Sequence, residues 1–294
     1  MIGLAEYFEW FPVNGEPIIL GDKDYILRNF TGTGNTMLNE QSQKAPFQRG
    51  ETFLNVDPQP RRILINLRIT GNLAKINQLK SKLSKALVSE PVRIGRAELG
   101  TLRYHREGQK ALELKSIPVQ SPQFTQITRR GNVLDADIEF FAPNPYWQSI
   151  KTSSILLMPD AKGFEFPFEF PFDIETGDIE LTVTNNGDIS TPILIRVFGG
   201  LDTFTITNLT TQDAIRVEGL IAANQYVEIN TEFGDKRVEL YEDGQFKQDI
   251  FAQLDVDFST FFRLERGVNR IKLEVVENTD GSARIFWKER FAGV

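Results

Sequence analysis

The second half of the chain is built from short alternating segments, and this pattern limits the fold more than any other feature. After residue 179, apolar and polar residues alternate in short runs, and turn dipeptides such as Asn186-Gly187 and Asp280-Gly281 separate the runs. Alternation with a period of two places one face of each strand in a core. The expected strands are 179–183, 193–198, 204–207, 214–217, 226–229, 238–240, 271–275 and 283–287. The pattern therefore predicts an antiparallel β-sandwich for this half.

One helix is expected, and it lies in the first half. Its apolar residues recur every three or four positions and would form one stripe: Leu73, Ile76, Leu79, Leu83 and Leu87. Asn72 can cap the start of this helix, and Pro91 prevents its continuation. The alternating segment 61–70 predicts a strand before the helix, and residues 92–116 predict a hairpin with Gly108 in its turn. We therefore expect an N-terminal β-sandwich with one amphipathic helix and a hairpin.

Two domains are predicted, residues 1–147 and 148–294. Pro143 and Pro145 interrupt strand pairing where we place the boundary. The two parts also differ in charge, because residues 1–150 hold 19 Lys and Arg against 15 Asp and Glu, whereas residues 151–294 hold 14 against 25. An acidic second half and the absence of a dense basic patch in the first half argue against nucleic acid as a partner.

The residue types exclude much catalytic chemistry. The chain has no cysteine and a single histidine, His105, so disulfides, thiolate zinc sites and cysteine nucleophiles are ruled out. His105 precedes the Gly108 turn, and we expect it to be an exposed turn residue. Phosphate-loop, nucleophile-elbow and zinc-protease motifs are absent. We therefore predict a protein that is not an enzyme and that binds no cofactor or metal.

Two weaker chemical hypotheses remain. Asp255 and Asp257, near Asp249, could hold calcium, but the glycine-turned loop and bidentate glutamate of a calcium loop are missing. A hydrolase would need two carboxylates about 5–9.5 Å apart, which the sequence cannot locate. The sequence shows no signal peptide and no apolar run long enough to cross a bilayer, so synthesis in the cytosol is expected.

Several surface features could serve in binding. The helix lysines either form a solvated face or meet an acidic surface of a neighbouring subunit. Phenylalanine occupies every second position from 164 to 172, and this face must be covered by its own domain or by a neighbour. Tyr241, Phe246 and Trp287 could stack on sugars, although packing in a core or interface is the alternative.

An ordered set of segments resembles one known family. These segments are 192–199, 206–211, 229–236 and 264–271, together with the junction 144–147 and the Phe-Pro repeat. The set resembles the distal tail proteins of long-tailed phages that infect Gram-positive bacteria, and of their prophages. The order of strand, helix and hairpin in the first half is similar as well.

The resemblance implies a structural hub at the tail tip of a virion, made in the host cytoplasm. In this family the N-terminal domain forms a hexameric ring, and a galectin-like or carbohydrate-binding-module-like sandwich projects outward. The ring would join the tail-tube protein to tail-tip or baseplate proteins, including a receptor-binding protein. The alternative function is a carbohydrate-binding or adhesin-like module acting on a cell surface.

A ring of identical subunits needs two different complementary faces on each subunit. The hairpin and the lysine-bearing helix are our candidates for one of them. The expected interface residues are Lys75, Lys80, Lys82, Lys85, Arg93, Arg96, Leu99, Leu102, Tyr104, Leu112 and Leu114.

Overall fold

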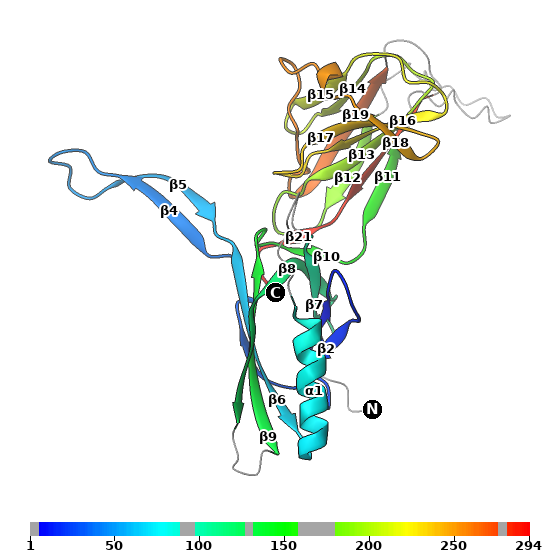
Figure 1. Cartoon of the computed structure of the whole chain (residues 1–294). Helices are drawn as coiled ribbons and strands as arrows, with labels where there is room; N and C mark the ends of the chain where they lie inside the picture. Colours follow the sequence, from blue (N-terminus) through cyan, green and yellow to red (C-terminus); the bar gives the residue numbers. More distant parts are fainter. Residues whose placement is uncertain (1–5, 89–97, 127–131, 158–179, 276–280) are drawn as a thin grey trace. The chain divides into compact units, whose positions relative to one another are not determined.

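The computed structural model describes residues 6–88, 98–126, 132–157, 180–275 and 281–294, which form two compact units (Figure 1). Unit 1 comprises the chain up to residue 150 together with residues 291–294, and unit 2 comprises residues 151–290. The last four residues thus belong to the first unit, whereas the sequence assigned them to the second. The predicted mainly β architecture is confirmed, and the described residues contain a single α-helix.

Unit 1 is built on one antiparallel sheet with the order β2-β1-β7-β8-β9-β6-β3, and β10 is added beside β8. Its strands are β1 (Glu6–Phe11), β2 (Ile18–Leu20), β3 (Ile26–Thr31), β6 (Arg61–Thr70), β7 (Gly100–Arg106), β8 (Leu112–Gln126), β9 (Val133–Ala142) and β10 (Trp147–Ser149). The short β21 (Arg290–Phe291) lies where the chain returns from unit 2.

The long strand β8 joins the two halves of this sheet. Residues 112–116 pair with β7, and from Ile117 onward the strand pairs with β9. The register shifts directly after Pro118, which has no N–H to donate to the ladder. One strand therefore serves two parts of the sheet, and both parts contribute to one core.

The predicted strand 61–70 and the predicted helix are confirmed. Ile63, Ile65, Leu67 and Ile69 of β6 are buried, and the stripe of α1 (Leu73–Ala86) packs into the same core. Asn72 caps the helix, because its Oδ1 accepts from the backbone N–H of Lys75 at 2.8 Å. Leu73 departs from the prediction: its side chain is exposed, so the buried stripe begins at Ile76. Burial of each such aliphatic side chain contributes about 1.5–3 kcal/mol.

The hairpin of the first half is formed by β7 and β8, and Gly108 in its turn has the positive φ of 71° that glycine adopts readily. His105 is not the exposed turn residue that we expected. It lies within β7, its ring stacks on Tyr7 at 4.4 Å between centroids, and its Nε2 is 3.3 Å from a carboxylate oxygen of Glu9.

Unit 2 is an antiparallel β-sandwich, as predicted. One sheet has the order β11-β20-β13-β16-β17-β18 and the other the order β12-β19-β14-β15. The strands are β11 (Ser153–Leu157), β12 (Glu180–Asn185), β13 (Ile193–Phe198), β14 (Phe204–Asn208), β15 (Asp213–Val217), β16 (Gln225–Asn230), β17 (Arg237–Glu242), β18 (Gln245–Asp249), β19 (Gly267–Val275) and β20 (Ser282–Trp287), and a 3-10 helix η1 covers Phe251–Gln253. The inward side chains of the two sheets form one apolar core.

All eight strands predicted for this half are present, whereas β11 and β18 were not predicted. The Phe-Pro repeat 164–172 lies outside the described residues. Within the described chain, no helix is long and apolar enough to cross a membrane.

Candidate functional site

A two-stranded arm, residues 37–58, extends from unit 1 (Figure 1). Its strands β4 (Leu38–Gln43) and β5 (Thr52–Pro58) pair only with each other among the described strands, and every residue in them is exposed. The sequence did not predict this element. A two-stranded ribbon without a covered face is only marginally stable in water. Contact with another surface would therefore stabilise the arm.

The arm has one mainly apolar face, which also holds Glu40 and Ser42, and one polar face. Cross-strand partners share a face, and along β4 the pairs Leu38–Pro58, Glu40–Val56 and Ser42–Phe53 alternate with the polar pairs Asn39–Asp57, Gln41–Asn55 and Gln43–Thr52. The register shifts between Gln41 and Ser42 and passes over Leu54, which brings Phe53 to the face of Ser42. Leu38 is 58% exposed and Phe53 is 65% exposed. The polar face bonds to itself, since Gln41 donates to Asp57. The apolar face is left for an external partner.

The tip of the arm holds a fully exposed aromatic ring. Phe47 adopts a positive φ of 64°, a backbone conformation that non-glycine residues adopt only at some cost. Gln48 closes the tip, because its backbone N–H donates to the Ala45 carbonyl at 3.1 Å and its side-chain oxygen accepts from the Ala45 N–H at 2.9 Å. The tip is therefore an ordered turn that directs Phe47 outward.

Arg61 holds the root of the arm. Its guanidinium donates to the carbonyl oxygens of Gly32 and Gly34 at 2.6 Å each and to Thr36 Oγ1 at 3.0 Å, all of which precede β4. It also donates to the carbonyls of Pro145 at 2.5 Å and Ala292 at 2.6 Å. The side chain is buried, and desolvation lowers its pKa to about 10. One buried cation thus joins three segments that are distant in the sequence.

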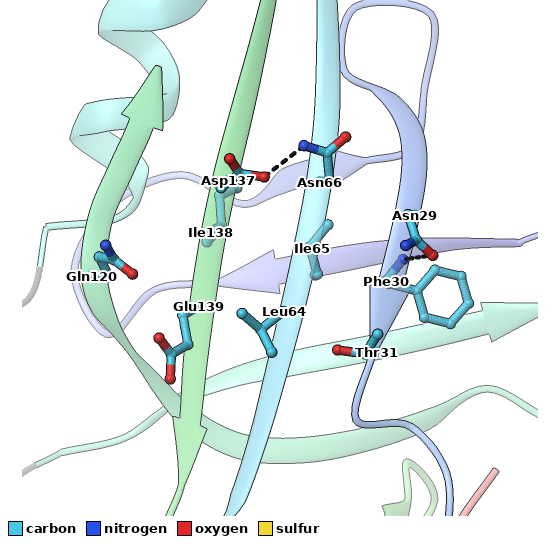
Figure 2. Close-up of a pocket in the computed structure, with 10 residues that line it drawn as sticks. All are labelled: Asn29, Phe30, Thr31, Leu64, Ile65, Asn66, Gln120, Asp137, Ile138 and Glu139. Carbon is cyan, nitrogen blue, oxygen red and sulfur yellow. Dashed lines mark hydrogen bonds between the residues drawn. The ribbon is translucent and has the colours of Figure 1, made fainter. Parts of the chain in front are cut away.

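The outer face of β6 and β9 is polar, and side chains along it bond to one another. Arg68 donates twice to Asp135, at 2.7 and 2.8 Å, and Arg62 bonds to Glu139. The hydrogen bonds from Arg68 hold the pKa of Asp135 below its ordinary value. Figure 2 shows Asn66 directed at Asp137, with 2.6 Å between Nδ2 and Oδ1.

A shallow depression of about 140 Å³ lies on this face, and Asn29, Leu64, Gln120 and Glu139 are among the residues that line it (Figure 2). Its two carboxylates, Asp137 and Glu139, are both engaged by neighbouring side chains. The depression is therefore polar, and neighbouring side chains hold both of its carboxylates in place.

The sheet ends at β3, and no strand of the described chain pairs with the other side of β3. Ile26 in this strand is 39% exposed. An edge of this kind presents backbone N–H and C=O groups that can pair with a strand of another chain. Unit 1 therefore offers two candidate assembly surfaces, the arm and the β3 edge.

The structure corrects part of the predicted interface. Leu102, Tyr104, Leu112 and Leu114 are buried in the core of unit 1, so their side chains cannot contact a neighbouring subunit. The hairpin strands alternate as expected, but the apolar face turns into the subunit itself. Leu99 is half-buried beside this hairpin.

The helix lysines have different environments. Lys75 Nζ lies 2.9 Å from Asp24 Oδ1, and Lys80 Nζ lies 4.8 Å from the centre of the Phe124 ring. Lys82 and Lys85 are exposed. Arg93 and Arg96 fall outside the described residues. A contact between this helix and a neighbour stays a prediction, and Lys82 and Lys85 are the residues best placed for it.

The predicted sugar contacts separate into two groups. Trp287 is 9% exposed and packs in the sandwich core, which removes it from any surface site. Tyr241 and Phe246 lie on the outer side of the six-stranded sheet, with ring centroids 6.0 Å apart.

The calcium hypothesis concerned Asp249, Asp255 and Asp257. In the structure the Asp249 carboxylate accepts from the backbone N–H of Phe251, and the Asp255 carboxylate accepts from that of Phe258. Throughout the described ranges, no cluster of acidic or histidine side chains is arranged to hold a metal ion.

Comparison with known proteins identifies the fold. Residues 186–291 match the family described as siphovirus-type tail component, C-terminal domain. The crystal structure of the SPP1 Dit protein, described as a hub of the adsorption apparatus in phages infecting Gram-positive bacteria, aligns with a TM-score of 0.68 and 12% identity over 97% of this chain and 99% of that one. A chain of the phage P2 baseplate in its activated conformation with calcium aligns with a TM-score of 0.55 and 12% identity over 98% and 99%. No curated protein sequence matches the chain. The resemblance to distal tail proteins is confirmed by these similarities.

Proposed function

We propose that this chain, whose residues 186–291 match the siphovirus-type tail component family, is the hub of a phage tail tip or baseplate. In this proposal unit 1 assembles into a ring, expected to be hexameric. The ring connects the tail-tube protein to tail-tip and receptor-binding proteins. The role is structural and needs no catalytic group or cofactor, and the protein is made in the host cytoplasm.

The observation that carries the proposal is the uncovered apolar face of the arm. Head-to-tail contacts around a ring require a donor surface and a different acceptor surface on each subunit. The arm is the donor: it is long, exposed on both faces and anchored at its root by Arg61. Docking of its apolar face on the next subunit would remove Leu38 and Phe53 from water, and burial of such side chains is favourable.

The β3 edge supports the same proposal. Pairing of β3 with a strand of the next subunit would continue the sheet from one subunit to the next, as in other cases of strand addition. The part of β8 beyond its pairing with β7, where Val119 is 43% exposed, is our candidate for the matching strand. A continuous sheet would then line a central channel with the polar face of β6 and β9.

Electron microscopy of the purified chain, alone and with the tail-tube protein of the same phage, tests this function. We expect closed rings, and rings capping tubes when both proteins are mixed. Tubes that never acquire a ring at an end, although this chain is present and folded, would contradict the proposal.

A further inference from the structure

The outer face of the six-stranded sheet in unit 2 carries four aromatic residues in one cross-strand row. Phe198, Tyr226, Tyr241 and Phe246 lie directly opposite one another on β13, β16, β17 and β18. Their sequence neighbours Val197, Val227 and Leu240 point into the core, so the row lies on the other side of the sheet. Strands are about 4.8 Å apart, and the row is therefore roughly 14 Å long.

The rings differ in what they leave accessible. Tyr226 and Tyr241 stack on each other with centroids 4.9 Å apart and planes within 6°, so each covers one face of the other. Phe246 stands at 81° to Tyr241, and Phe198 is tilted by 44° from Tyr226. The two phenylalanines at the ends are 37% and 57% exposed. The row thus has an accessible apolar ring at each end and tyrosine hydroxyls between them.

Charged groups beside the row neutralise one another. The buried carboxylate of Glu228 accepts from Arg196 at 2.9 Å and from Arg237 at 3.2 Å. Arg237 also bonds to Glu239 at 3.0 Å, and Glu239 accepts from the Tyr241 hydroxyl at 3.1 Å. The face is therefore rich in fixed hydrogen-bonding groups, and its guanidinium groups next to the row are already occupied by carboxylates. This composition suits a ligand that has many hydroxyls and no charge.

We propose that this row is a binding site for a neutral oligosaccharide. A sugar ring has an apolar C–H face and a polar rim, which matches an aromatic ring bordered by hydrogen-bonding side chains. Phe246 and Phe198 stack on sugar units at the two ends, and the tyrosine hydroxyls with Glu239 bind the hydroxyls between them. The length of the row suits an oligosaccharide better than a single sugar. Arg284, an exposed residue of β20 opposite Arg196, lies to one side and takes no part.

The test is calorimetric titration of the full chain with four neutral hexasaccharides: maltohexaose, cellohexaose, laminarihexaose and chitohexaose at millimolar concentration. We expect at least one of them to bind, and Phe246→Ala and Phe198→Ala each to weaken that binding about tenfold, which corresponds to about 1.4 kcal/mol. The matched control is Phe233→Ala, because Phe233 is 79% exposed in the same unit but lies outside the row. Tyr241→Phe keeps the ring and tests the hydroxyl separately. Circular dichroism verifies that each variant is folded.

Three results would overturn the proposal. The first is that none of the four hexasaccharides binds. The second concerns the residues outside the row: Phe233→Ala weakens binding as much as Phe246→Ala, which would indicate a different site, or Arg284→Ala alone abolishes binding, which would indicate an anionic ligand. The third is that Phe246→Ala changes the mass of the particle in solution, which would make the row a subunit or protein interface. Because ring formation is proposed for unit 1, loss of sugar binding with intact rings would leave the proposed function standing.

Discussion

The Arg61 guanidinium donates a 2.6 Å hydrogen bond to the carbonyl oxygen of Ala292, so the segment that returns from unit 2 meets the root of the arm. The same side chain bonds to Gly32 and Gly34, which lead into β4. The orientation of the arm therefore depends on one buried cation that is solvated by carbonyl oxygens in place of water.

Replacement of Arg61 should destabilise unit 1. In Arg61→Ala the carbonyls of Gly32, Pro145 and Ala292 lose their donor in a buried site, which we expect to lower the free energy of unfolding by about 3 kcal/mol. Chemical denaturation measures this difference. The control is Arg62→Ala, because the Arg62 side chain is 60% exposed and its loss should cost below about 1 kcal/mol. Equal effects of the two substitutions would show that Arg61 does not hold the root.

Charge on the apolar face of the arm should block assembly without unfolding the chain. Phe53→Asp places a carboxylate where we expect contact with a neighbour, while its side chain is exposed within the subunit, so stability should change by less than about 0.5 kcal/mol. Asn55→Asp introduces the same charge on the polar face and should assemble normally. Analytical ultracentrifugation separates the outcomes, and intact rings in Phe53→Asp would count against the arm as the donor surface.

Shortening a core side chain of the β7–β8 hairpin should lower the stability of the fold and not only affect assembly. Leu102 and Leu114 are fully buried, so Leu102→Ala should cost about 2–5 kcal/mol of stability. Thermal unfolding measures the change, and Lys85→Ala on the exposed side of α1 serves as the control. If Leu102→Ala keeps wild-type stability but fails to form rings, the Leu102 side chain contributes to a subunit interface and the prediction is wrong.

The Arg68–Asp135 pair predicts a stability difference that depends on pH. The folded-state pKa of Asp135 is depressed by the hydrogen bonds from Arg68, so the pair stabilises the fold above the unfolded-state pKa of about 3.9. This contribution is lost as the pH falls through the folded-state pKa. Wild type should therefore exceed Asp135→Asn in stability at neutral pH, and the two should converge in acid. Urea titrations across this range measure the gap, and a gap that widens in acid would be inconsistent with the pair.

Local periodicity was sufficient for much of the fold. Ile63 to Ile69 alternate because one face of β6 is buried, and Ile76, Leu79 and Leu83 repeat because one side of α1 packs on the same core. Such signals are local and can be read from the chain. The polar sequence of β18 and the mixed sequence of the arm carry no comparable signal, since neither element buries a face within the subunit.

The site was harder to predict for a physical reason. Alternation shows that Leu102 and Leu114 share a face, but it does not show whether that face meets the same subunit or another. The same ambiguity left Trp287 as either a sugar contact or a packed residue, and it packs in the core. Arg61 acts through backbone carbonyls, which have no sequence signature, and its acceptors are as distant as Ala292. The role of each of these residues depends on contacts between segments that are distant in the sequence, and these contacts became visible only in the three-dimensional structure.

The mass of the purified full chain in solution tests the central claim most directly. Native mass spectrometry should show a closed assembly of six 33.5 kDa subunits in the wild type, which should collapse to single subunits in Phe53→Asp and persist in Asn55→Asp. A wild-type chain that is folded and remains a single 33.5 kDa subunit at every concentration would contradict the account.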